Sequence, residues 1–162
     1  MQALNGQQIA LLLKKIPATK KIFISVCARD LETRPVRKIE KKPRAIIHNT
    51  GYLVNGIHWV LLLCTKECTV FIDTFGRSPS DLLIESTARR GGGIPILYNT
   101  QTLQHSTTQV YGHWTIYYLI HFCKGYTLKE INSKFSKNLK KNDLIVFNFV
   151  KKLGRKWGVT IR

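Results

Sequence analysis

The chain has 162 residues, of which 44% are apolar, enough for one sizeable hydrophobic core and too few for two. We therefore expect one domain over residues 1–162. No run approaches eighteen apolar residues, so no transmembrane helix and no membrane partner are predicted. The 26 Lys and Arg residues outnumber the 9 Asp and Glu residues, and the formal net charge of +17 favours a polyanionic partner.

The positive charge is concentrated at the two ends of the chain. Residues 1–44 carry eleven basic and three acidic side chains and residues 124–162 carry eleven and two, whereas residues 45–123 hold four of each. A single pair such as Lys140-Lys141 is typical of a solvated helix face. Summed over the chain, however, a pI of about 10.1 predicts non-specific binding to DNA or RNA that weakens with salt.

The first half of the chain predicts one helix followed by strands. Asn5 can cap a helix that runs to about Lys15 and ends before Pro17. Four strands are expected, at residues 22–28, 45–49, 57–64 and 69–73. The last two form a hairpin about a Lys66-Glu67 turn, near the centre of the sheet. The proline-containing, highly charged segment 31–43 is predicted to be a surface loop.

The second half predicts mainly helices. Ser78 or Ser80 can cap a helix over residues 81–84, and the glycine-rich segment 89–93 is typical of a linker. A short strand at 94–98 precedes an apolar, nearly buried helix that begins at Gly112. Two further helices are expected, at residues 128–138 and 143–153. The order of elements indicates an α+β fold.

The cysteines and the N-terminal segment indicate the compartment. Cys27, Cys64, Cys68 and Cys123 lie in apolar or strand-like contexts, so we expect reduced thiols and not a secreted disulfide framework. Zinc would require ligands beyond the Cys64/Cys68 pair, and no metal or cofactor is predicted. Residues 9–13 are too short for the apolar part of a signal peptide. An intracellular protein is expected, and the basic runs suit the nucleus.

A histidine and an aspartate stand at the ends of the predicted hairpin. His58 opens the first strand and Asp73 closes the second, so with a turn near Lys66 the two residues lie opposite each other. An imidazole held by a carboxylate keeps the tautomer that can accept a proton from a nucleophile. Taken alone, each residue is better explained as a half-buried histidine and an aspartate that caps a turn.

Gln104 and the start of the apolar helix suggest further parts of an acyl-transfer site. The Gln104 side-chain N–H would stabilise the oxyanion of a tetrahedral intermediate, a role worth roughly 2.7–4 kcal/mol per donor. Backbone N–H groups near Tyr111 and Gly112 would add donors at the positive end of the helix dipole. Taken alone, a loop glutamine most often faces water.

Together these segments resemble the adenovirus-type cysteine protease (adenain) family. The matching residues are Ala45 to Thr50, Gly56 to Trp59, Asp73 to Gly76, Gln104 and Tyr111-Gly112. The resemblance is to the versions carried by Maverick/Polinton-type elements and related DNA viruses, with the SUMO-deconjugating proteases as distant relatives. The similarity extends over nearly the whole chain.

The resemblance implies a papain-like α+β fold with a central mixed sheet and flanking helices. It also implies cleavage of viral precursor proteins, binding to DNA as an activating polyanion, and a location in the host-cell nucleus or the virion. In that family His58 would be the base, Asp73 the residue that orients it, and Gln104 the oxyanion donor.

The nucleophile position departs from the family, because Tyr111 stands where the family has cysteine. A phenol has a pKa near ~10 against ~8.5 for a thiol, and its oxygen lies ~6.5 Å from its own Cα against under ~3 Å for a thiol sulfur. Tyr111 would therefore overshoot the scissile carbonyl. The sequence predicts a pseudoenzyme of viral or transposon origin that binds nucleic acid.

Two other interpretations stay open. The first is an active, DNA-stimulated endopeptidase that uses another nucleophile. Cys64 would lie about 20 Å from His58 along the strand, and Cys123 about 18 Å from residue 111 along the helix, so neither thiol can act. The remaining candidate nucleophiles are the hydroxyls of Ser106, Thr107 and Thr108. The second is a basic nucleic-acid-binding domain whose protease-like spacing is a coincidence, which would place His58, Asp73 and Gln104 far from Tyr111.

Overall fold

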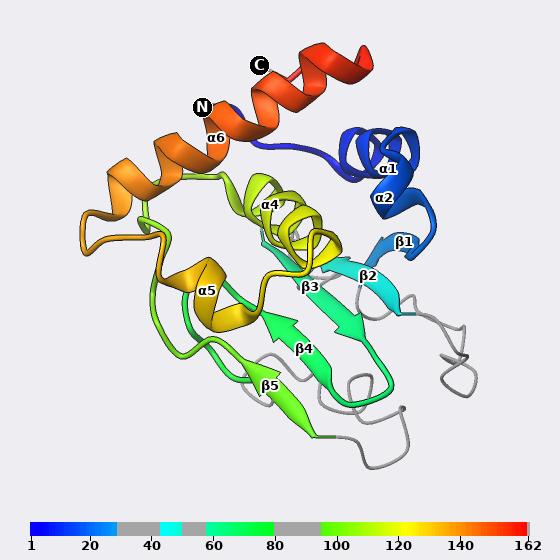
Figure 1. The fold of residues 1–162 in the computed structure, drawn as a ribbon. Coiled ribbons are helices and arrows are strands. Elements are labelled where there is room, and N and C mark those ends of the chain that lie inside the picture. Colours follow the sequence, from blue (N-terminus) through cyan, green and yellow to red (C-terminus); the bar gives the residue numbers. More distant parts are fainter. Residues whose placement is uncertain (29–42, 50–57, 80–94, 162) are drawn as a thin grey trace.

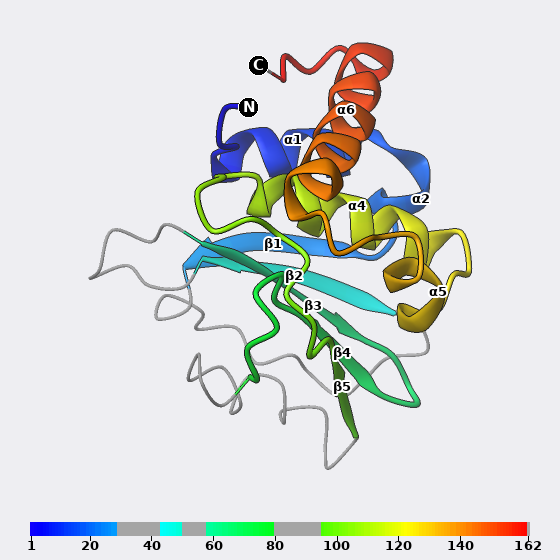
Figure 2. The ribbon, with the colours of Figure 1, turned by 90° about the vertical axis from the view of Figure 1, so that its left-hand side faces the viewer.

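The computed structural model describes residues 1–28, 43–49, 58–79 and 95–161. The described part contains a five-stranded mixed sheet with helices gathered over one face (Figures 1 and 2). The α+β prediction is therefore confirmed. Most of the predicted loop 31–43, the predicted helix 81–84 and the predicted linker 89–93 lie outside the described residues.

The sheet has the strand order β1-β2-β3-β4-β5. Its strands are β1 (Phe23–Ala28), β2 (Arg44–Asn49), β3 (Trp59–Cys64), β4 (Thr69–Ile72) and β5 (Ile96–Tyr98). The two outer pairs, β1 with β2 and β4 with β5, are parallel, and β3 is antiparallel to both of its neighbours. The predicted hairpin is formed by β3 and β4, and β3 is the central strand.

The helices are α1 (Gly6–Lys15), α2 (Pro17–Lys20), α4 (Tyr111–Cys123), α5 (Leu128–Asn132) and α6 (Leu139–Trp157). Asn5 caps α1 as predicted, and Gln8 completes a capping box. Pro17 not only ends α1 but also begins α2, where its missing N–H costs nothing. Among these described helices, none is long and apolar enough to cross a membrane.

The last two predicted helices have different bounds in the structure. The predicted helix 128–138 ends at Asn132, and the helix predicted from residue 143 already begins at Leu139. The physical reason is a cap: Asn138 accepts a hydrogen bond from the N–H of Lys141 and starts α6 early. Gly158, with φ of 62°, ends α6 four residues beyond the predicted Leu153 helix end, after Trp157.

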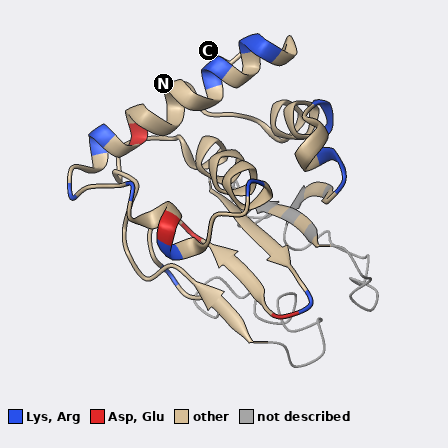
Figure 3. Ribbon diagram, in the orientation of Figure 1, with Lys and Arg blue, Asp and Glu red and all other residues tan. Residues whose placement is uncertain are grey.

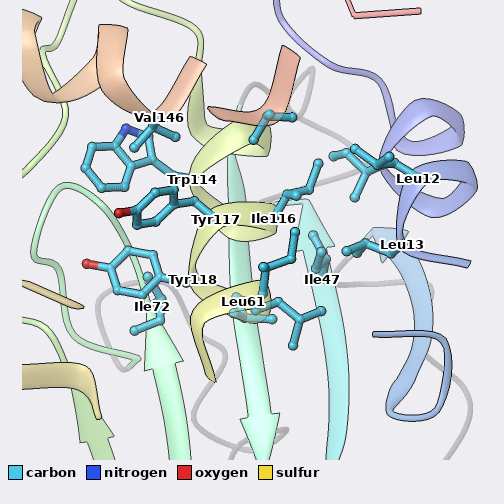
Figure 4. Close-up of a cluster of buried hydrophobic side chains, with 14 of the residues drawn as sticks. Leu12, Leu13, Ile47, Leu61, Ile72, Trp114, Ile116, Tyr117, Tyr118 and Val146 are labelled. Carbon is cyan, nitrogen blue, oxygen red and sulfur yellow. The ribbon is translucent and has the colours of Figure 1, made fainter. Parts of the chain in front are cut away.

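Helix α4 forms the centre of the hydrophobic core (Figure 4). Every residue from Tyr111 to His121 is buried, as the apolar sequence of this helix predicted. Its side chains pack with apolar side chains from the sheet, from α1 and from α6. Leu61 and Leu63 of β3 belong to this core, whereas Val60 and Leu62 belong to a smaller cluster with Phe71. Strand β3 is thus apolar on both faces.

The start of α4 lies close against α1 and β3, and Gly112 makes this approach possible. A Cβ atom at residue 112 would lie 3.0 Å from Ile9 Cδ1 and 3.3 Å from Trp59 Cδ1. The glycine in the Tyr111-Gly112 motif therefore has a packing reason. This contact places the first turn of α4 next to the beginning of β3.

Candidate functional site

His58 and Asp73 meet at one end of the β3–β4 hairpin. His58 immediately precedes β3, and Asp73 immediately follows β4. The distance from His58 Nε2 to Asp73 Oδ1 is 2.6 Å. Leu61 pairs with Ile72, so continuing this register places Asp73 beside Val60, and His58 lies two residues further on. The two residues are therefore diagonal neighbours and not directly opposite as predicted, and their side chains bridge the offset.

The Asp73 carboxylate is fully buried and accepts hydrogen bonds at both oxygens. Oδ1 also accepts from the backbone N–H of Phe75 at 3.1 Å, and Oδ2 accepts from Arg77 Nε at 2.6 Å. Burial alone raises the pKa of Asp73, but the hydrogen bonds from His58, Arg77 and Phe75 and the charge of His58 together lower it below 3.8. The carboxylate is thus ionised at neutral pH, and His58 Nε2 carries the shared proton.

The backbone of Asp73 is held by a buried asparagine from the segment after β5. Asn99 Oδ1 accepts from the N–H of Asp73 at 3.1 Å, and Asn99 Nδ2 donates to the carbonyl of Asp73 at 2.6 Å. The following turn packs on the same segment at Gly76, which has φ of 76° and whose Cβ would lie 2.8 Å from Thr100 O. The position of the carboxylate therefore depends on β5 as well as on the hairpin.

The remaining ring nitrogen of His58 has no hydrogen-bond partner among the residues that the structure describes. The imidazole stacks on Phe75, with 5.0 Å between ring centroids, and meets the edge of Tyr111 at 5.2 Å. Nδ1 is buried and unpaired within the described part of the chain. Because Nε2 carries the proton, a neutral imidazole keeps a lone pair on Nδ1. That lone pair is what a general base needs to accept a nucleophile's proton.

Tyr111 is the first residue of α4, and no side chain caps this helix start. The side chain is 8% exposed, and burial raises the pKa of its phenol, which is therefore protonated at neutral pH. The phenol packs against the imidazole through its ring and makes no hydrogen bond to Nδ1. The structure thus brings His58, Asp73 and Tyr111 together, with a phenol at the position where a nucleophile would be expected.

Gln104 lies near this group but does not face water. Its Oε1 accepts from the hydroxyl of Thr74 at 2.7 Å, and its Nε2 donates to the carbonyl of Thr108 at 3.0 Å. The side chain is fully buried. In this arrangement the amide connects the turn after Asp73 to the loop before α4. Nε2 also lies 3.4 Å from the hydroxyl of Thr108, so its N–H groups are directed at Thr108 inside the protein.

The hydroxyl groups of the loop before α4 also have partners, apart from the exposed Ser106. The hydroxyl of Thr108 lies 2.7 Å from Asp143 Oδ2, and that of Thr107 lies 2.9 Å from His105 Nδ1. In the residues described here, none of these hydroxyls is bonded to His58. Cys64 is buried at the far end of β3, so it does not reach His58 either.

Several residues that build the site were missed by the sequence reasoning. Arg77 and Asn99 contact Asp73, and Phe75 stacks on His58. Buried Asp143 of α6 accepts hydrogen bonds from the backbone of His105, from Thr108 and from Trp114 Nε1. The spacing of four residues between Asp73 and Arg77 predicts a contact only on a helix, and here the chain forms a turn. The contacts of Asn99 and Asp143 span 26 to 38 residues and left no local pattern.

Comparison with known proteins identifies the fold. No protein-family model matches the sequence, and no curated protein matches it. Among solved structures, the chain is similar to the SUMO protease Ulp1 with its catalytic cysteine oxidized to a sulfinic acid, with a TM-score of 0.52 and 15% identity. The match covers 90% of this chain and 76% of that one. The chain has the papain-like fold of Ulp1-type cysteine proteases. At this level of identity the likeness concerns the fold alone.

Proposed function

We propose that this protein is an adenain-like homologue of the cysteine proteases that binds its partners without cleaving them. The observation that carries the proposal is the environment of His58: its imidazole is bonded to a buried carboxylate, its Nδ1 has no partner among the described residues, and the neighbouring residue at the start of α4 is Tyr111. The base and the orienting residue of a hydrolase are retained, and the nucleophile is replaced.

Three features of the site oppose catalysis by Tyr111. Burial raises the pKa of its phenol and makes the nucleophilic phenolate still less accessible, its hydroxyl does not reach Nδ1 of His58, and its ring packs beside the imidazole. The Gln104 amide is also bonded to Thr108, so it would have to change partner before it could stabilise an oxyanion. We propose Gln104 as an oxyanion donor only in an ancestral or restored enzyme.

Restoring the thiol tests the proposal directly. We expect Tyr111→Cys to cleave members of a fluorogenic peptide panel and the unmodified protein to cleave none. The introduced thiol should also react with iodoacetamide faster than the same thiol in a His58→Ala background, because an imidazole promotes thiolate formation. Tyr126→Cys is the matched control, since Tyr126 is an exposed tyrosine at 41%.

The outcomes separate the alternatives. Equal cleavage by the unmodified protein and Tyr111→Cys would favour the active endopeptidase, with a nucleophile other than residue 111. An introduced thiol at 111 that reacts no differently with and without His58 would overturn the assignment of His58 as the base.

A second proposed activity is binding to nucleic acid, supported by the way the two basic ends of the chain converge. Lys15 Nζ donates to the carbonyls of Trp157 and Gly158 at 3.1 and 3.3 Å, which joins the end of α1 to the end of α6. Figure 3 shows basic residues on α1, α2 and the C-terminal part of α6. We define the basic surface by six exposed residues: Lys14, Lys20, Lys21, Lys152, Arg155 and Lys156.

The distribution of acidic residues supports the same proposal. In the described part of the chain the exposed acidic residues are Glu67 at the hairpin turn and Glu130 on α5, both outside the basic surface. Asp73 and Asp143 are buried. Within the described residues, positive charge on the basic surface is therefore not offset by a neighbouring acidic side chain, and a phosphodiester backbone is the partner that fits it. With this activity we propose a location in the nucleus or in a virion, where nucleic acid is present. We also propose viral precursor proteins as further binding partners.

Salt dependence tests the nucleic-acid proposal. We expect retention on duplex DNA at low salt, a steep loss at moderate salt, and a log–log salt slope that falls by about one for each phosphate contact removed. The triple variant Lys20→Gln, Lys152→Gln, Arg155→Gln should show the smaller slope, and Lys66→Gln at the hairpin turn is the control. No retention at low salt, or an unchanged slope in the triple variant, would contradict this surface.

A further inference from the structure

Arg77 contacts Asp73 directly and also contacts Phe75, the ring that stacks on His58. Its Nε donates to Asp73 Oδ2 at 2.6 Å, and its guanidinium carbon lies 5.4 Å from the centroid of the Phe75 ring. That same ring stacks on His58 at 5.0 Å. The side chain of Arg77 is 40% exposed, whereas the carboxylate that it contacts is completely buried. A cation at the rim of the site is therefore bonded to the orienting carboxylate.

The two oxygens of Asp73 depend on different partners. Oδ1 accepts from His58 and from the backbone of Phe75, whereas in the described residues Oδ2 is bonded to Arg77 alone. Removing the guanidinium would leave a buried charged oxygen unpaired, and the carboxylate would rotate or recruit water to recover a partner. Either response changes the geometry of the bond from Oδ1 to His58.

We propose that Arg77 is a positioning residue, which holds the Asp73 carboxylate so that Oδ1 faces His58 Nε2 and Nδ1 stays directed away from Asp73. The proposal rests on the proposed function, because it treats the His58–Asp73 pair as the retained part of a catalytic group. Arg77 acts through Asp73 and is not assigned a contact with substrate. The bond between Nε and Oδ2 is charge-assisted, which suits this role.

A purely structural role for Arg77 makes a different prediction. If the ion pair only stabilised the turn between Asp73 and Arg77, its loss would lower the melting temperature and leave the His58–Asp73 bond unchanged. The two roles can therefore be separated by observing that bond in the folded protein.

The first experiment observes the His58 Nε2 proton by NMR in the full-length protein. A short bond to a carboxylate should place this resonance far downfield, and its loss in His58→Gln assigns it. We expect Arg77→Gln to shift or broaden the resonance, Arg77→Lys to recover it in part through its charge, and Lys66→Gln to leave it unchanged. Thermal melts confirm that each variant is folded. An unchanged resonance in folded Arg77→Gln would overturn the positioning role.

The second experiment measures catalysis in the Tyr111→Cys background. Arg77→Gln should lower kcat by roughly tenfold to a hundredfold, the range for a misplaced catalytic group, with little change in KM. A rise in KM at constant kcat would contradict the proposal. If Tyr111→Cys shows no cleavage at all, the proposed protease ancestry of the site fails, and the NMR measurement still decides the role of Arg77.

Discussion

Two regions of this molecule are built around a fully buried aspartate, and their partners differ in kind. At the end of the sheet, Asp73 is bonded to the ionisable side chains of His58 and Arg77. Between α4 and α6, Asp143 accepts hydrogen bonds from three neutral groups: the backbone N–H of His105, the hydroxyl of Thr108 and the indole N–H of Trp114. Asp73 fixes the proton on Nε2 of His58, so that Nδ1 of the same ring is left without a partner among the described residues. Asp143 only connects α6 to α4 and to the loop before α4.

The buried histidines of the two regions differ in the same way. One ring nitrogen of His58 is bonded to a carboxylate, whereas neither ring nitrogen of His113, on α4, is bonded to any residue in the described part of the chain. Burial, with a smaller contribution from the N-terminal ammonium, lowers the pKa of His113 from 6.5 to about 4. His113 is therefore a neutral packing group beside Phe147. A buried histidine is therefore a candidate base where a carboxylate is bonded to its ring, as at His58, and a packing group where none of the described residues is bonded to its ring, as at His113.

The largest expected effect is the loss of the Asp143 contacts. Asp143→Ala leaves two donors unpaired in or near the core, the backbone N–H of His105 and Trp114 Nε1, whereas the Thr108 hydroxyl keeps the carbonyl of His105 as an acceptor. At about 1–3 kcal/mol for each buried group, we expect a loss of roughly 4 kcal/mol in the free energy of unfolding. Urea titration at neutral pH measures it. Asp143→Asn, which keeps an acceptor, should lose clearly less. Equal losses in the two variants would mean that the carboxylate charge matters more than its hydrogen bonds.

His113 should limit stability in mild acid. Because its folded pKa of about 4 lies below its ordinary value of 6.5, the unfolded chain takes up the proton first as the pH falls. Stability is lost between about pH 6.5 and pH 4, by about 3 kcal/mol for a shift of this size. We expect His113→Leu to remove this loss, so its advantage over the unmodified protein should grow from pH 7 to pH 4.5 in urea titrations. If the stability advantage of His113→Leu were the same at every pH, the loss of stability in mild acid would not come from His113.

Asp73 should contribute in a lower pH range. Its pKa is lowered below the ordinary 3.8, so its contribution is complete above that value and is lost as the pH falls through the folded pKa. Asp73→Asn should cost about 2 kcal/mol at neutral pH, the scale of hydrogen bonds to a charged group, and the difference from the unmodified protein should shrink below about pH 4. If the difference in unfolding free energy between the two proteins had already vanished at pH 6, it would not arise from the titration of Asp73.

Much of the fold could be predicted because its elements have local causes. The cap at Asn5, the apolar run of β3 and the turn at Lys66 are each contained within a few residues. The misplaced start of α6 shows the limit of this reasoning, since Asn138, predicted as the end of the preceding helix, instead caps α6.

The candidate site was predicted only in part. The spacing of His58, Asp73 and Tyr111 indicated residues that do lie together, but it did not indicate that the Gln104 amide is bonded to Thr108. The catalytic roles assigned to these residues stay predictions until the thiol is restored at position 111.

The sequence by itself determined the five strands, the helices α1 and α4, the excess of positive charge at both ends and the phenol at the start of α4. Only the tertiary structure decided that Arg77 and Asn99 share Asp73, and that Lys15 joins the two basic ends at α6. The physical reason is distance along the chain: caps and periodicity act over a few residues, whereas the partner of a buried polar group is whichever side chain the packed core brings within about 3 Å.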